Sequence, residues 1–276
     1  MISSQASDGT AYQLCGDCQR ASVVLIHGLG LNLHMWDAFI PHLSSKYQVL
    51  RYDLYGHGQS SALPHETKSL KRSARQLKDL LDELDIPCCT IAGFSIGGMI
   101  NRRFAMDYPE HTEALIVLNS PHERSVEQQR LVEQRADDTA QGGAAATLDE
   151  AIERWFTEQY LRCAENTVQQ VREWVVRTDP VGFMQFRQVL AKGVKELICP
   201  QPPIAVPTLV MTCENDQGST PAMSYAIANE IRGAEVIVVN KLRHLGVMED
   251  ADAFLQPMMQ FLAREQQNEH KQPDQK

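Results

Sequence analysis

The sequence predicts an α/β protein with a mostly parallel, doubly wound sheet that is interrupted once by a helical insertion. Short apolar runs alternate with helical segments over the first 121 residues, and the alternation resumes after residue 200. The runs are continuously apolar, which is typical of strands buried on both faces. Such a β–α alternation favours a parallel sheet covered by helices on both sides.

Six segments are predicted to be strands because they are short, rich in aliphatic or β-branched residues, and followed by loop residues. They are residues 22–26, 47–52, 88–92, 115–118, 208–212 and 236–239. Four segments between or after these strands are predicted to be helices. In the first segment, leucines recur at helical spacing on one face and charged residues lie on the opposite face. They are residues 70–84, 97–108, 221–231 and 251–263.

The segment 122–199 differs from the rest because it contains no convincing strand. It is rich in Glu, Gln, Arg and Ala, and its aromatic residues recur at helical spacing, so it predicts three or four helices. Packing is the ordinary role for these aromatics, although a helical insertion can also cover a pocket. We therefore expect a core domain at 1–121 and 200–265, a helical cap at 122–199, and a disordered tail at 266–276.

Composition and charge exclude several classes of function. The 276 residues are 43% hydrophobic and 22% charged, which is ordinary for a globular protein. With 26 basic and 35 acidic residues the net charge is −9, and without a basic cluster this argues against nucleic-acid binding. No apolar run approaches the roughly 20 residues of a membrane span, and residues 1–10 lack the blocks of a signal peptide. The expectation is a cytoplasmic protein without a membrane partner.

The strongest motif is Gly93–Phe94–Ser95–Ile96–Gly97, which fits G-x-S-x-G between a predicted strand and a predicted helix. A turn this sharp holds the serine in strained backbone angles and needs small residues on both sides. The serine hydroxyl then lies at the N-terminus of a helix, where the helix dipole favours a developing negative charge. The motif predicts that Ser95 is a catalytic nucleophile.

A serine hydroxyl becomes a good nucleophile only when a base takes its proton. His244 follows the last predicted strand and precedes the last helix, so it is placed to reach Ser95 at the same sheet edge. Asp216 follows the strand at 208–212 and is predicted to orient the base, with Glu214 as its chief competitor. The chain order Ser, Asp, His is the order that suits a nucleophile on this kind of turn.

Two glycine-bearing loops complete the predicted site. The loop at His27–Gly28–Leu29–Gly30 directly follows a strand, and it lets a backbone N–H approach a substrate oxygen. The amides of Leu29 and Ile96 are predicted to form the oxyanion hole. His27 is expected to brace its loop by hydrogen bonding, and Asp53 to accept hydrogen bonds from backbone N–H groups.

Taken together, these motifs resemble the α/β-hydrolase superfamily, in which a helical cap interrupts the sheet domain. The resemblance covers nearly the whole chain. Within the superfamily the chain is most similar to the 3-oxoadipate enol-lactonase group, on segments 151–157, 177–183 and 219–223. The segment 216–221 is one residue longer than the commonest pattern. The resemblance also implies that Trp155 lines the substrate pocket.

The predicted function is a serine hydrolase of a small ester or lactone, with Ser95, His244 and Asp216 as catalytic residues and no cofactor or metal. Carbon–carbon bond hydrolysis and cofactor-free perhydrolase or oxygenase chemistry use the same framework and stay open. A ligand receptor of the same fold with weak turnover is the alternative of another class. The sequence leaves the natural substrate and the oligomeric state open, a homo-oligomer included.

Overall fold

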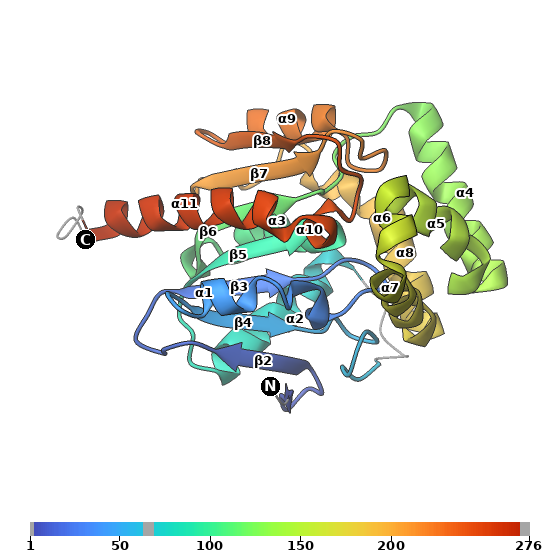
Figure 1. Cartoon of the computed structure of the whole chain (residues 1–276). Helices are drawn as coiled ribbons and strands as arrows, with labels where there is room; N and C mark the ends of the chain where they lie inside the picture. The colour runs from blue at the N-terminus through green and yellow to red at the C-terminus, as the bar shows by residue number, and fades with distance from the viewer. Residues whose placement is uncertain (1–2, 63–68, 271–276) are drawn as a thin grey trace.

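The computed structural model describes residues 3–62 and 69–270, and its described strands form one eight-stranded sheet (Figure 1). The strand order is β1-β2-β4-β3-β5-β6-β7-β8, and the pairs from β4 to β8 are parallel, whereas β1–β2 and β2–β4 are antiparallel. The strands are β1 (Ser4–Gln5), β2 (Ala11–Cys15), β3 (Ser22–Ile26), β4 (Gln48–Tyr52), β5 (Cys89–Phe94), β6 (Thr112–Leu118), β7 (Thr208–Cys213) and β8 (Glu235–Val239). The predicted fold class is confirmed.

The four predicted helices of the sheet unit are α2 (Leu70–Glu83), α3 (Ile96–Asp107), α9 (Pro221–Asn229) and α11 (Ala251–His270). Short helices α1 (Ile40–Leu43) and α10 (Gly246–Glu249) accompany them. In Figure 1, α11 crosses the face of the sheet turned to the viewer, and α3 lies behind the sheet. The central strands β3, β4 and β5 are buried along their whole length, as expected for strands of a parallel sheet covered on both faces.

Two features of the sheet domain differ from the sequence expectation. The sequence predicts no strand at β1 or β2. Strand β2 lies next to the edge strand β1, and its buried positions include the polar Gln13, so it lacks a continuous apolar run. Helix α11 continues through residues 264–270, where the sequence is polar on every face. Residues 266–270 of the expected tail therefore continue a helix, and residues 271–276 lie outside the described residues.

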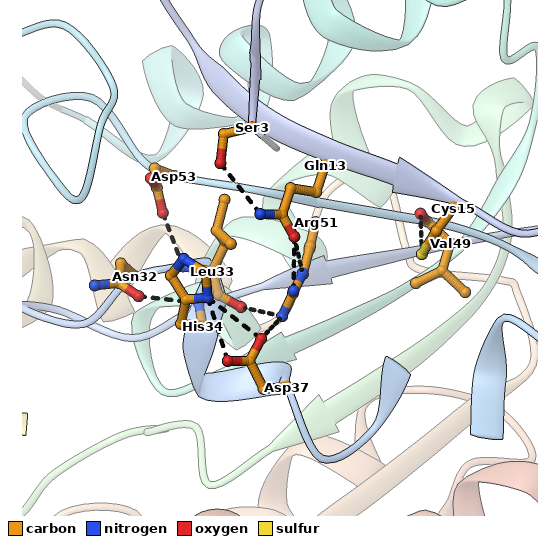
Figure 2. A network of polar contacts seen from close by, with 10 residues as sticks. All are labelled: Ser3, Gln13, Cys15, Asn32, Leu33, His34, Asp37, Val49, Arg51 and Asp53. Atoms are coloured by element: carbon orange, nitrogen blue, oxygen red, sulfur yellow. Dashed lines mark hydrogen bonds and ion pairs between the residues drawn. The ribbon is translucent and has the colours of Figure 1, made fainter. Parts of the chain in front are cut away.

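A buried arginine ties β4 to the segment that follows β3 (Figure 2). Arg51 is 2% exposed, and its guanidinium donates to Gln13 Oε1 at 2.6 and 3.0 Å and to the Leu33 carbonyl at 3.0 Å. It also pairs with Asp37 Oδ1 at 2.5 Å. A charge at this depth needs such partners, so the network fixes the loop after β3 against the sheet.

The expected cap segment, all of which the structure describes, consists of five α-helices inserted between β6 and β7, more than the three or four predicted, because α6 is too short to show helical spacing in the sequence. They are α4 (Val126–Gly142), α5 (Leu148–Trp155), α6 (Glu158–Cys163), α7 (Glu165–Arg177) and α8 (Pro180–Lys192). Figure 1 shows them gathered at one end of the sheet, the end toward which β5 points. Within the described residues, no helix combines the length and apolar character needed to cross a bilayer.

Candidate active site

Ser95 lies between β5 and α3 in strained backbone geometry. Its φ is 56° and its ψ is −114°, in a region that non-glycine residues rarely occupy. A Cβ on Gly93 would overlap the Gly97 carbonyl, and a Cβ on Gly97 would overlap the Ile26 carbonyl. The two glycines of the motif are therefore required by the close approach of strand, turn and helix.

The structure brings Ser95, His244 and Asp216 together, although they are far apart in the chain. His244 Nε2 lies 3.2 Å from Ser95 Oγ, and His244 Nδ1 lies 2.6 Å from Asp216 Oδ2. Because a carboxylate can only accept, the imidazole carries its proton on Nδ1, and Nε2 is left to accept from the serine hydroxyl. This arrangement can move a proton from Ser95 to His244.

Asp216 is held as a carboxylate by four hydrogen bonds. Its Oδ1 accepts from the amides of Gly218 and Ser219, both at 2.9 Å, and its Oδ2 accepts from His244 and from Asn119 Nδ2. Burial by itself would raise the pKa of Asp216, but the His244 imidazole and these hydrogen bonds outweigh burial and lower the pKa below its ordinary value. The group facing His244 therefore stays negatively charged at neutral pH.

Sequence reasoning missed Asn119 and kept Glu214 as a competitor. Asn119 directly follows β6, is fully buried, and has a positive φ of 45°. Its position just after a parallel strand was the only signal in the sequence. Glu214 is exposed, and its Oε2 accepts from the Lys241 amide at 2.9 Å. Asp216, not Glu214, is the carboxylate bonded to His244.

The loop after β3 lies beside Ser95. Gly28 and Leu29 line the same cavity as Ser95, and Ile96 is the first residue of α3, whose N–H has no acceptor within its own helix. His27 is fully buried, with Nδ1 2.7 Å from the Gly28 carbonyl and Nε2 accepting from the Leu54 amide at 2.9 Å. Burial, with His57 nearby, lowers the pKa of His27 to about 3, so it braces the loop as a neutral imidazole.

Asp53 holds the loop that follows β4. Its carboxylate accepts from the amides of Leu33 and Gln59, each at 2.8 Å, and Figure 2 shows the first of these bonds. Gly58 has a positive φ of 52°, and a Cβ there would overlap the Asp53 carboxylate. The expected role of Asp53 as an acceptor for backbone N–H groups agrees with these contacts.

Ser95 and His244 line one cavity that is partly open to solvent. Trp155 at the end of α5 lines the cavity, and its ring centroid lies 6.5 Å from that of His244. The loop of His244 is bonded to the cap on both sides: Leu245 N donates to the Trp155 carbonyl at 2.8 Å, and Arg243 donates to the Phe156 carbonyl at 3.0 Å. The end of α5 therefore lies beside the site and is hydrogen-bonded to the histidine loop.

Comparisons with known proteins agree with this geometry. A family model described as the alpha/beta hydrolase fold matches residues 21–145. The chain is 27% identical over 244 residues to 3-oxoadipate enol-lactonase 2 of Acinetobacter baylyi, covering 88% of this chain and 89% of that protein. It is 26% identical over 247 residues to the (E)-2-((N-methylformamido)methylene)succinate hydrolase of the same species, covering 87% of this chain and 89% of the relative.

Solved structures extend the comparison to three dimensions. The crystal structure of the enol-lactonase from Burkholderia xenovorans LB400 superposes with a TM-score of 0.85 at 28% identity, covering 92% of this chain and 96% of that chain. These matches confirm the expected resemblance to the α/β-hydrolase superfamily and, within it, to the enol-lactonase group.

Proposed function

Because the chain has the α/β-hydrolase fold, we propose that it is a cofactor-independent serine hydrolase that cleaves a small ester or lactone through an acyl-enzyme. The observation that carries the proposal is the chain of contacts from Ser95 Oγ to His244 at 3.2 Å and from His244 to Asp216 at 2.6 Å. The relatives named as enol-lactonases and hydrolases support this chemistry. A cytoplasmic location stays a prediction from the sequence.

In the proposed first step, Ser95 Oγ attacks the substrate carbonyl while His244 Nε2 takes the serine proton. Asp216 fixes the imidazole tautomer and stabilises the imidazolium that forms. The leaving oxygen takes the proton from His244, and the C–O bond breaks to leave an acyl group on Ser95. Water, deprotonated by His244, then attacks the acyl group, releases the acid and restores the serine.

The tetrahedral intermediates of both steps carry a negative charge on the former carbonyl oxygen. We assign the amides of Leu29 and Ile96 as the donors to this oxygen, supported by the position of Ile96 at the start of α3 and of Leu29 on the cavity wall. Each such donor typically lowers the barrier by about 3 kcal/mol. The cap, with Trp155 on the cavity wall, would exclude bulk water during the reaction.

The proposal is tested with Ser95→Ala and p-nitrophenyl acetate. The variant should lose about three orders of magnitude or more in kcat/KM, because no other group replaces the nucleophile. Ser224→Ala is the matched control, since Ser224 is a fully buried serine whose hydroxyl has no hydrogen-bond partner within the described chain. Activity of Ser95→Ala within tenfold of the wild type contradicts the proposal.

A panel of lactones, esters and carbon–carbon ring-cleavage products, with product analysis, separates the chemistries that share this framework. Preferred cleavage of lactones or esters supports the proposal. A single slow turnover that leaves Ser95 covalently modified would instead indicate a receptor of the same fold.

A further inference from the structure

Four arginines line the cap side of the cavity that contains Ser95. Arg124 precedes α4, Arg135 lies on α4, Arg154 on α5 and Arg187 on α8. The chain as a whole carries a net charge of −9. Positive charge is therefore concentrated on this wall against the overall charge of the protein.

Three of these arginines share one carboxylate. Glu150 lies 3.1 Å from Arg135 and 3.9 Å from Arg154, and its charge also acts on Arg187. Three guanidinium groups with one carboxylate leave two positive charges unbalanced. Asp216 also lines the cavity and its charge acts on Arg154, but both of its carboxylate oxygens already accept hydrogen bonds, one of them from His244.

Arg187 is the least compensated member of this group. It is 9% exposed, and its side chain makes no hydrogen bond or ion pair with any described residue. Burial, followed by the nearby Arg154 and Arg135, lowers the pKa of Arg187 to about 10, so it is still charged at neutral pH. A buried charge without a partner is unfavourable, and such groups cluster at functional sites.

Arg124 supplies a second donor that is not fully used. Two of its nitrogens donate to the carbonyls of Leu190 and Ala191, at 3.2 and 3.3 Å, and to Gln129 Oε1 at 3.3 Å. Its Nε is buried and has no partner among the described residues. These bonds fix the guanidinium beside the cavity, and its charge adds to the positive charge of this wall.

Taking the proposed hydrolase function as its basis, we propose that the substrate is an ester or lactone that carries two free carboxylates, one of which binds Arg187. A guanidinium presents a planar fork that matches a carboxylate with two parallel hydrogen bonds. Two carboxylates balance the two positive charges that Glu150 leaves unbalanced among Arg135, Arg154 and Arg187. Hydrolysis breaks the acyl C–O bond with one water and produces a third carboxylate on the same acid.

The first test compares three p-nitrophenyl esters that differ in charge. They are the butyrate, the monoester of glutaric acid, and the monoester of propane-1,2,3-tricarboxylic acid, with zero, one and two free carboxylates. In the wild type, kcat/KM should rise with each charge and be at least tenfold higher for the doubly charged ester than for the butyrate. A wild type that prefers the butyrate, or gains nothing from the second carboxylate, overturns the proposal.

Arg187→Gln tests the residue itself, with Arg130→Gln as the matched control. Arg130 is an exposed arginine of α4 that pairs with Glu127 at 2.9 Å and does not line the cavity. The ratio of kcat/KM between the doubly charged and neutral esters should fall at least tenfold in Arg187→Gln and keep its wild-type value in Arg130→Gln. An unchanged ratio in Arg187→Gln contradicts the assignment.

Arg187→Lys is the second variant should Arg187→Gln not fold. It keeps the positive charge but not the fork, so the ratio should fall by a smaller factor. A Lys variant with the full wild-type ratio would contradict bidentate binding at this residue.

Calorimetric titration with free propane-1,2,3-tricarboxylate separates this inference from the hydrolase proposal. Binding by the wild type that weakens at least tenfold in Arg187→Gln supports the anion site, even if no ester is turned over, in which case the hydrolase proposal alone fails. Ester hydrolysis without charge preference and without binding of the acid refutes the inference and leaves the hydrolase proposal standing.

Discussion

Asn119 donates from Nδ2 to Oδ2 of Asp216 at 2.9 Å, and the same oxygen lies 2.6 Å from His244 Nδ1. The backbone N–H of Asn119 also donates to the Met211 carbonyl, at 2.8 Å. The residue at the end of β6 therefore orients the carboxylate that follows β7. This contact couples two neighbouring strand ends to the position of the histidine.

Asn119→Gly should destabilise the protein and make that loss depend on pH. Glycine adopts the positive φ of this position without strain, so the variant removes the side chain alone. A hydrogen bond to a charged group contributes about 1.5–3 kcal/mol to stability. The free energy of unfolding of Asn119→Gly should therefore be lower than that of the wild type by this amount at pH 7. Because the pKa of Asp216 is lowered by folding, the contribution is present above its ordinary value of 3.8 and disappears as the pH falls through the folded value.

Urea unfolding at pH 7 and at a series of values down to pH 3 measures this difference. Lys241→Gly is the matched control, since Lys241 is an exposed residue with a similar φ of 64°. A stability difference for Asn119→Gly that stays constant over the whole range would contradict a role through the carboxylate.

Gly93→Ala should prevent or severely impair folding. The added Cβ would overlap the Gly97 backbone, which cannot move without displacing the start of α3. We expect a loss of more than about 3 kcal/mol in the free energy of unfolding, comparable with a large core disruption. Gly233→Ala separates backbone strain from overlap, because Gly233 has a φ of +78° and no atom near a Cβ, and it should lose only about 1–2 kcal/mol. Equal losses in the two variants, measured in urea, would argue against the overlap.

Arg243→Ala should loosen the cap from the histidine loop. Arg243 donates to the carbonyls of Glu153 and Phe156 at 2.7 and 3.0 Å, and it directly precedes His244. We expect kcat/KM for p-nitrophenyl acetate to fall about tenfold, which corresponds to about 1.4 kcal/mol of transition-state stabilisation. Arg264→Ala removes an exposed ion pair with Glu235 and should leave the rate unchanged. Wild-type kinetics in Arg243→Ala would show that the anchor does not position the histidine.

His27→Gln should flatten the dependence of stability on acid pH. The pKa of His27 is about 3 in the folded protein, against an ordinary value of 6.5. Below pH 6.5 the unfolded chain binds a proton at His27 that the folded chain does not. The free energy of unfolding is therefore not reduced by His27 above pH 6.5, and it falls as the pH drops toward 3. In that window the wild type should lose about 1.4 kcal/mol more per pH unit than the variant. Urea unfolding between pH 7 and 4.5 measures the slopes, and equal slopes in the wild type and His27→Gln would contradict the prediction.

Most of the sheet could be predicted because each buried strand has a local signature. The strands β3, β4 and β7 are rich in aliphatic residues and buried over their whole length, and each begins within one residue of its predicted start. Strands β1 and β2 could not be predicted this way. Gln13 is buried and accepts hydrogen bonds from Arg51 of the neighbouring β4, and nothing in the sequence of β2 indicates that partner.

The sharp turn at Ser95 could be predicted from the local sequence alone, because the glycines permit the turn and the adjacent strand and helix define its direction. The order of Ser95, Asp216 and His244 could likewise be read along the chain, since each follows a strand of one parallel sheet. Their convergence, and the bond from Asn119 to Asp216, depend on which strands lie side by side. The arginines that line the cavity are the clearest case. Charged residues on helices are expected to face solvent. Only the packing of α4, α5 and α8 makes Arg135, Arg154 and Arg187 line the same cavity.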